Sequence, residues 1–439
     1  MRAFLLIAVL AALCGPALGA ERFPPPDFTD HKLPVTQTPP PRWNFLEYLD
    51  VAVLAAAMGA ATFLALKVRS RLGVLLVMVA SLLYLGLYRE GCVCPIGAIQ
   101  NVTLALFDPS YAVPWTVVAF FLLPLVVTLF FGRTFCAGVC PLGAIQDVVV
   151  MRPIKVPPWL QHCLGLLAWV YLGLAVLFAA TSSAFVICEY DPFVSFFRLN
   201  GTWRMLVLGG CMLVIGMFVA RPYCRFLCPY GALLRPLSRL AWWHARITPD
   251  KCVQCRLCED SCPFGAIAAP NQDEMPLDRG EGKRALGGLI VLLPVLVALG
   301  GGLGRALATP LSRMHATVRL AEQVSLEDAG KLQCTTNPTD PAYVFRTTGR
   351  AKADLYQEAG ALHGKFVVGS AVMGGFVGLV IGLKLIGLSL RRRRSDYEAD
   401  RSICLSCGRC FSYCPVDREW RKRRGYSAQG PQPPPFWKQ

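Results

Sequence analysis

The stretch "FCAGVCPLGAIQD" at 135–147 decides how this chain is organised, because it returns as "YCRFLCPYGALLR" at 223–235. An earlier copy, "GCVCPIGAIQN" at 91–101, separates its two cysteines by one residue instead of three. Each copy follows a hydrophobic segment and continues from Cys-Pro into x-Gly-Ala. Repetition of the whole block favours a shared chemical role for its cysteines over simple packing.

Composition places the chain in a membrane. Its 439 residues are 54% hydrophobic and only 16% charged, which is too apolar for an ordinary soluble protein of this size. The formal charge of +16 comes from basic residues beside hydrophobic segments, where the positive-inside rule explains them without a nucleic-acid partner. The sequence therefore predicts an α-helical integral membrane protein that does not bind nucleic acid.

Hydrophobic runs define the predicted spans. Residues 1–20 have the layout of a secretory signal peptide, and the Pro-rich segment 21–45 reads as an exposed extracytoplasmic linker. About seven runs are long enough to cross roughly 30 Å of hydrocarbon. These runs are 46–66, 72–88, 113–131, 159–181, 203–220, 286–304 and 366–388.

Charge asymmetry orients these spans. The basic segments at 67–71, 151–155, 221–256 and 391–394 all fall on one side, which the positive-inside rule makes cytoplasmic. We therefore expect a multi-pass protein of the cytoplasmic membrane with its N-terminus outside and its C-terminus inside. Loops near 89–112 and 182–202 and a small domain at 305–365 are expected outside.

Two regular cysteine runs predict a bacterial-ferredoxin-like module. Each matches C-x2-C-x2-C-x3-C-P, in which the fourth cysteine ligates the other of two [4Fe-4S] clusters. Zinc also suits C-x2-C, but it does not explain two complete runs that end in Cys-Pro. The runs are Cys252, Cys255, Cys258 and Cys262 in ferredoxin half 246–275, and Cys404, Cys407, Cys410 and Cys414 in half 395–420.

The transmembrane core, 46–245, holds the repeated blocks. Cys136 and Cys140 are four residues apart, as are Cys224 and Cys228, so a helical segment puts both thiols of a pair on one face. The two pairs together offer four thiolates to one further iron–sulfur cluster at the inner membrane face. The alternative is that these small residues only pack.

The first copy of the block is expected on the opposite side. Cys92 and Cys94 follow an outward-running span, and Cys188 and Cys334 fall on the same side. Cys92, Cys94 and Cys188 are candidate ligands of an outer cluster, which would be the second membrane-associated cluster. Cys334 is a weaker candidate because only its location supports it. Disulfide chemistry remains the alternative in an oxidising compartment.

Other polar residues carry weaker signals. His162, Asp147 and Arg152 are first interpreted as structural, solvated or snorkelling groups and only second as quinone contacts. Cys163 and Cys211, inside predicted spans, are expected to pack. The absence of C-x-x-C-H argues against covalent haem c.

Together, the C-x3-C-P blocks and ferredoxin runs resemble the membrane polyferredoxins of the NosR/NapH type. The resemblance covers residues 45–262 and 400–415. It implies electron transfer between quinol or cytoplasmic donors and periplasmic reductases or their maturation systems. A short linker stands where the nitrous-oxide branch has a flavin domain, so we expect no FMN. An additional hairpin, with helices at 286–304 and 366–390, separates the two ferredoxin halves.

These observations favour an electron-transfer protein without catalytic acid, base or nucleophile. Its partners would be redox proteins on one or both sides of the membrane, and a quinol dehydrogenase component remains open if quinone binds. Arg225, Arg256 and Arg409 would raise cluster potentials and steer an acidic partner. The alternative is a membrane redox sensor or maturation factor. A transporter is disfavoured because ionisable residues are nearly absent from the spans. The basic, Pro-rich tail at 421–439 carries no assigned role.

Overall fold

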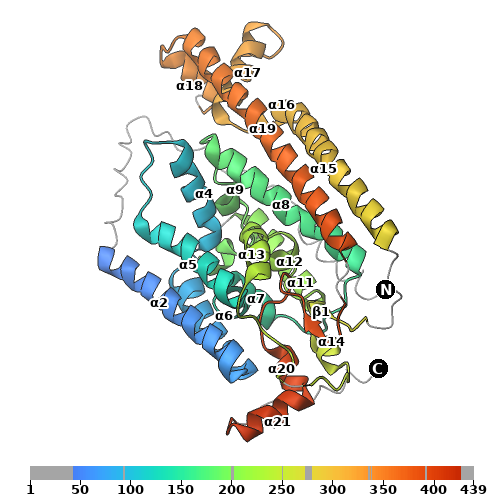
Figure 1. Ribbon diagram of the computed structural model, residues 1–439. Coiled ribbons are helices and arrows are strands. Elements are labelled where there is room, and N and C mark those ends of the chain that lie inside the picture. The colour runs from blue at the N-terminus through green and yellow to red at the C-terminus, as the bar shows by residue number, and fades with distance from the viewer. Residues whose placement is uncertain are drawn as a thin grey trace, which may run out of the picture. The chain divides into compact units, whose positions relative to one another are not determined.

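The computed structural model describes residues 43–91, 94–198, 202–249, 251–271, 279–334, 337, 339–390 and 393–426. These residues are mostly helical (Figure 1). The predicted signal peptide, nearly all of the predicted linker and the last residues of the tail lie outside this part of the chain.

Within the described ranges, five helical segments are long and apolar enough to cross a membrane. Three further apolar helices in the same ranges are shorter than 18 residues. The chain is thus a multi-pass membrane protein. The long segments are α2 (Asn44–Phe63) continued by η1 (Leu64–Val68), α3 (Arg71–Ser81) continued by η2 (Leu82–Tyr88), α8 (Pro158–Ala180), α15 (Arg279–Ala306) and α19 (Lys352–Ser389). The shorter ones are α4 (Pro95–Phe107), α5 (Trp115–Phe131) and α11 (Trp203–Phe218).

Each predicted span coincides with a helix. The spans at 113–131 and 203–220 fall on α5 and α11, which have 17 and 16 residues, or about 25 Å each at 1.5 Å per residue. Seven crossings therefore stay a prediction. The prediction of a loop at 89–112 is wrong in one respect, because α4 lies within it and buries the residues from Pro95 to Gln100.

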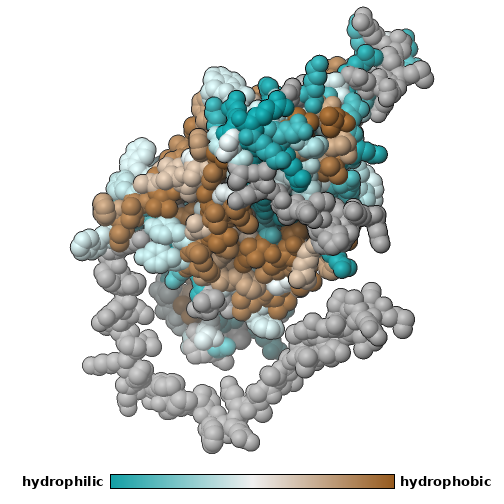
Figure 2. Space-filling view, turned by 90° about the horizontal axis from the view of Figure 1, so that it is seen from below, coloured by the Kyte–Doolittle hydropathy of each residue, from teal (hydrophilic) through white to brown (hydrophobic). Residues whose placement is uncertain are grey.

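The surface agrees with a lipid environment. Hydrophobic side chains cover a broad area of the face in Figure 2. Trp115 and Trp203, 79% and 67% exposed, begin α5 and α11, while Trp242 and Trp243 pack against the other end of α5. Aromatic residues at helix ends are typical of the boundary between lipid and water.

The repeated block is a helix start. In all three copies the second cysteine is the N-cap and the following proline is the first helical residue, a position where the missing proline N–H costs nothing. The two C-x3-C copies each add a short helix in front. The elements are α6 (Thr134–Gly138) and α7 (Pro141–Val148), then α12 (Pro222–Phe226) and α13 (Pro229–Leu240).

Helices α15 and α19 form the predicted hairpin, and they pack backbone against backbone. A Cβ added at Gly374 would lie 2.1 Å from the carbonyl oxygen of Gly300, and one at Gly304 would lie 2.0 Å from that of Ser370. Small residues allow such close approach between membrane helices. Helix α19 also packs on α8.

At one end of this hairpin lies a small helical unit where the domain at 305–365 was predicted. Its core is apolar and includes Val324 and Phe345. Helix α19 begins at Lys352, earlier than predicted, because its first turns belong to this unit and bury Leu355. The unit comprises α16 (Ala308–Ser312), α17 (Ala316–Asp328) and α18 (Pro341–Thr347).

The two ferredoxin halves fold together although the hairpin separates them in sequence. Strand β1 (Ile267–Ala268) pairs antiparallel with β2 (Glu398–Ala399), with Ile267 opposite Ala399. The halves also bring together three short helices. These are α14 (Leu257–Ser261), α20 (Arg409–Tyr413) and α21 (Pro415–Arg423). Elsewhere in the chain, the connection between α8 and α11 contains two short helices, α9 (Val186–Glu189) and α10 (Val194–Phe197).

A buried ion pair fastens the second half to the membrane helices. Arg69, between η1 and α3, donates to the carboxylate of Asp417 in α21, and their side chains are 7% and 0% exposed. The Arg69 guanidinium also lies 4.0 Å from the centre of the Phe411 ring. The ferredoxin module is therefore held against the first residues of α3.

Candidate iron–sulfur centres

Four cysteines from both runs line one cavity of the ferredoxin module. Three come from the first run and the fourth, Cys414, comes from the second. This is the exchange of fourth cysteines that the spacing predicts. We call this set the first ferredoxin group: Cys252, Cys255, Cys258 and Cys414.

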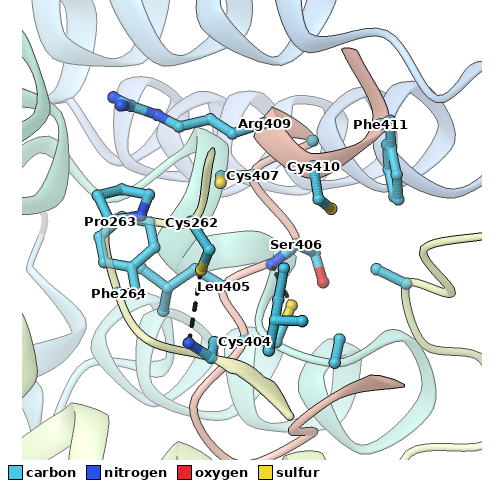
Figure 3. A pocket seen from close by; sticks show the side chains of 15 residues that line it. Cys262, Pro263, Phe264, Cys404, Leu405, Ser406, Cys407, Arg409, Cys410 and Phe411 are labelled. Carbon is cyan, nitrogen blue, oxygen red and sulfur yellow. Dashed lines mark hydrogen bonds between the residues drawn. The ribbon is translucent and has the colours of Figure 1, made fainter. Parts of the chain in front are cut away.

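The reciprocal set lines a second cavity (Figure 3). Here Cys262 of the first run joins three cysteines of the second run. Phe264 and Leu405 form an apolar wall beside them. We call this set the second ferredoxin group: Cys262, Cys404, Cys407 and Cys410.

Unusual backbone angles direct N–H groups at the sulfurs. Gln254 and Ser406 have φ of 52° and 58°, values that L-residues rarely adopt. Their amides donate to Sγ of Cys252 and of Cys404, each at 3.4 Å. Strain that recurs at equivalent places in both halves points to a functional constraint, and amide hydrogen bonds to sulfur tune cluster potentials.

The repeated blocks bring together a third set within the helical core. Cys140 lies within electrostatic range of the other three thiols. Polar groups face the sulfurs: Gln146 Nε2 is 3.3 Å from Cys224 Sγ, and the amide of Gly231 is 3.2 Å from Cys228 Sγ. We call this set the membrane quartet: Cys136, Cys140, Cys224 and Cys228.

The first copy of the block is only partly described. Cys94 interacts electrostatically with Cys188 and with the buried Asp191, whereas Cys92 lies outside the described residues. Cys334 instead lies near Arg346, in the small helical unit that contains α16, α17 and α18. We call Cys94 and Cys188 the outer pair. Asp191 had no distinguishing signal in the sequence.

Buried arginines near the cysteine groups indicate whether an anionic cofactor would fit there. Arg133, Arg221 and Arg225 are 3%, 0% and 8% exposed. Arg221 pairs with Asp147, but in the part of the chain that the structure describes neither Arg133 nor Arg225 pairs with a carboxylate. Arg133 reaches the carbonyl of Ser402 and approaches Cys136 Sγ at 3.9 Å. The Nε atoms of Arg133 and Arg225 have no hydrogen-bond partner.

Buried charges without counter-charges are costly. A cluster held by four thiolates is anionic, and it would supply the negative charge that the arginines lack. The donor set therefore fits iron–sulfur clusters in the membrane quartet and in the second ferredoxin group, which shares Arg133 as a neighbour.

Protonation of the thiols leads to the same conclusion. Burial raises the pKa of Cys258 and of Cys404 to about 12, so at neutral pH both thiols stay protonated until a metal displaces the proton. If the thiols stayed neutral, the positive charges of the buried arginines Arg133 and Arg225 would have no negative partner among the described residues. Binding of iron at Cys258 and Cys404 would therefore release protons, and the resulting thiolates would supply negative charge near the arginines.

No group of three or more His, Cys, Asp or Glu among the described residues is placed to hold a single metal ion. Tetrahedral zinc needs four ligand atoms within about 2.3 Å of one centre. The cysteines surround cavities instead.

Three predictions about polar and thiol side chains need correction. Asp147 is not a solvated charge: its side chain is 1% exposed and pairs with arginines. Cys163 and Cys211 do not pack internally but are exposed on α8 and α11, because those helices turn one face outward. Arg152 is exposed as expected, and the carbonyl of His162 accepts from Lys384.

Comparison with known proteins finds 4Fe-4S binding domains in this chain. A family model described as "4Fe-4S binding domain" matches residues 113–158 and 202–248, which contain both C-x3-C-P blocks. Another model with the same description matches residues 245–268, which contain the first ferredoxin run. No solved structure matches the chain.

Several curated proteins are similar to part of the chain. Protein NirI of Paracoccus denitrificans is 32% identical over 37% of this chain and 25% of its own length. The putative electron transport protein YccM of Escherichia coli is 27% identical over 38% of this chain and 52% of its own. Regulatory protein NosR of Pseudomonas aeruginosa is 31% identical over 43% of this chain and 28% of its own.

The chain thus spans about half or less of the length of these relatives. The chain is thus a multi-pass membrane protein with 4Fe-4S binding domains, and it is similar to the membrane polyferredoxins of the NosR/NapH type.

Proposed function

We propose that this protein conducts electrons across the cytoplasmic membrane through a row of four cysteine groups. Two [4Fe-4S] clusters would occupy the ferredoxin groups, a third cluster the membrane quartet, and a fourth the outer pair together with Cys92. Clusters bound there supply the one-electron chemistry, while the protein sets spacing and potential. One observation carries the proposal: the same side chains lie near cysteines of the second ferredoxin group and of the membrane quartet, and other side chains lie near both the membrane quartet and the outer pair.

The inner step is supported by residues between the second ferredoxin group and the membrane quartet. Arg221 interacts electrostatically with Cys407 of the second ferredoxin group and with Cys224 of the membrane quartet. Cys136 packs in the same apolar cluster as Phe264, beside Cys262 and Cys404. Arg221 and Phe264 therefore neighbour cysteines of both groups.

The outer step is supported by buried aromatic residues. Tyr230 lies within electrostatic range of Cys94 and also of Cys136, Cys140 and Cys228. Tyr223 interacts with Cys94 and Cys228 in the same way, and its ring packs edge-on against Phe193 at 5.6 Å. The outer pair therefore neighbours the membrane quartet through packed aromatic side chains.

Orientation follows the charge asymmetry of the sequence. The ferredoxin module would face the cytoplasm and the outer pair the extracytoplasmic side, with the unit of α16 to α18 beside it. An acidic redox protein or quinol would exchange electrons at the inner side, and a redox protein at the outer side. A non-catalytic electron-transfer subunit fits better than an enzyme, because no described group resembles a nucleophile with its base.

A regulatory role is the second candidate. One relative carries the name "Regulatory protein NosR", and a redox sensor or maturation factor would need the same clusters. The two functions differ in rate, because a conduit must reduce its partner as fast as the pathway turns over. Stopped-flow oxidation of the reduced protein by its partner distinguishes them.

The exchange of fourth cysteines gives a direct test of the two ferredoxin groups. Cys414→Ser should weaken or abolish the same electron paramagnetic resonance (EPR) signal as Cys255→Ser, although the two residues lie in different runs. Cys262→Ser should instead match Cys407→Ser, because these two residues share the other cavity. Each variant should lose up to about four irons per chain.

The comparison needs anaerobically purified protein, with iron and sulfide counted on the same samples. If Cys414→Ser matched Cys407→Ser, the fourth cysteines would not be exchanged. If none of the four variants changed iron content, these cysteines would not be ligands.

A further inference from the structure

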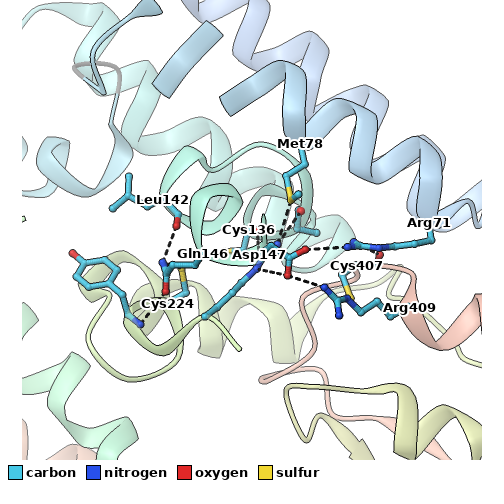
Figure 4. Close-up of polar contacts among 12 residues, drawn as sticks. Arg71, Met78, Cys136, Leu142, Gln146, Asp147, Cys224, Cys407 and Arg409 are labelled. Atoms are coloured by element: carbon cyan, nitrogen blue, oxygen red, sulfur yellow. Dashed lines mark hydrogen bonds and ion pairs between the residues drawn. The ribbon is translucent and has the colours of Figure 1, made fainter. Parts of the chain in front are cut away.

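Three arginines converge on one buried carboxylate between the second ferredoxin group and the membrane quartet (Figure 4). Asp147, in α7, accepts from Arg71 at 2.9 Å, from Arg409 at 3.2 Å and from Arg221 at 3.3 Å. These arginines come from three different places: α3, α20 and the residue just before α12.

Two of the arginines continue to cysteine carbonyls of different groups. Arg71 Nη1 donates to the carbonyl of Cys407 at 3.1 Å. Arg221 donates to the carbonyl of Cys136 and, at 3.4 Å, to that of Ala137. An unbroken chain of polar contacts therefore runs from Cys407 through Asp147 to Cys136.

Burial makes this bridge electrostatically effective. The side chains of Asp147 and Arg221 are 1% and 0% exposed, so water screens their charges little. Burial alone would raise the pKa of Asp147, but Arg221, Arg409 and Arg71 hold it below its usual range. The carboxylate thus stays ionised and contributes one fixed negative charge among three positive ones.

We propose that Asp147 is a positioning residue that sets the potentials of two centres at once. It aligns the arginines that fix the spacing of the second ferredoxin group and the membrane quartet. Its charge lowers the potential of both centres, and the arginines raise it. This inference rests on the proposed function, since it needs clusters in both groups.

The test is a redox titration of four variants of the full-length protein, followed by EPR. Asp147→Asn should raise the midpoint potentials of both centres, and Arg409→Gln should lower them. Each change corresponds to about a tenfold change in the reduced-to-oxidised ratio at a fixed potential. The double variant should return close to the wild-type values, and Asp147→Glu should restore them in part.

Two comparisons separate electrostatics from damage to the fold. The first ferredoxin group should keep its potential, because among the described residues Asp147 pairs with the three arginines and with none of that group's cysteines. Asp260→Asn is the control: this carboxylate is 58% exposed and pairs with Lys155 at 2.8 Å, so its removal should shift no potential appreciably.

Opposite shifts from Asp147→Asn and Arg409→Gln would support the inference, since a purely structural defect would not reverse with the sign of the charge. Unchanged potentials, or shifts in the same direction in both variants, would overturn it. Iron content distinguishes this failure from failure of the proposed function. Wild-type protein with only about eight irons per chain would lack a cluster in the membrane quartet altogether.

Discussion

Replacing Cys140 by Ser is expected to remove about four irons per chain while both ferredoxin centres stay filled. Cys140 is 8% exposed at the start of α7 and interacts with all three other thiols of the membrane quartet. Hydroxyl replaces thiolate with little change in volume, so the helix start remains while the ligand is lost. The measurement is iron and acid-labile sulfide per chain after anaerobic purification.

Cys211→Ser is the matched control, because Cys211 is exposed on α11 and belongs to none of the groups. Its iron content should equal that of the wild type. The same iron content in Cys140→Ser would contradict the assignment of a cluster to the membrane quartet. That result would mean that the repeated cysteines only pack against their neighbours.

Arg69→Ala is expected to reduce the free energy of unfolding by about 3–5 kcal/mol, the usual cost of breaking a buried ion pair on one side. The variant would remove the cation that pairs directly with Asp417, whose side chain is 0% exposed, and leave, among the described cations, only Arg421 within electrostatic range. It would also lose the contact of the guanidinium with Phe411. Thermal unfolding in detergent, with limited proteolysis of the ferredoxin module, measures the effect.

The comparison variant is Arg423→Ala, whose pair with Glu419 at 3.8 Å is more than 70% exposed on both sides. It should change stability by less than about 1 kcal/mol. Because a buried pair often has an apolar substitute of similar stability, Arg69→Met with Asp417→Leu should recover much of the loss. Equal stability of Arg69→Ala and Arg423→Ala would contradict the claim that Arg69 holds the second ferredoxin half against the membrane helices.

Short-range sequence patterns predicted which cysteines of the ferredoxin module lie together. The C-x2-C-x2-C-x3-C-P runs indicated both ferredoxin halves and the exchange of Cys262 and Cys414, because the spacing itself encodes that geometry. Repetition of C-x3-C-P indicated the pairing of residues 136–140 with 224–228. Hydropathy indicated the apolar helices, although α4 was missed because it is short and follows Cys94-Pro95.

Long-range contacts between charged residues could not be predicted. Asp147 lies in "AIQDVVVMRP", where any charge at a helix end is usually solvated, and its partners are up to 262 residues away along the chain. The backbone contact between Gly300 and Gly374 was equally hidden, because glycine is common in membrane helices whether or not they pack closely.

Electron transfer across a sealed bilayer tests the central claim most directly. Protein would be reconstituted into liposomes that contain ferricyanide, and dithionite would be added outside as reductant. The account predicts that ferricyanide is reduced inside liposomes carrying the wild-type protein. Reduction should fall to the level of empty liposomes for Cys140→Ser and for the double variant Cys94→Ser, Cys188→Ser. Wild-type protein with its full iron content and no reduction above empty liposomes would contradict a transmembrane path.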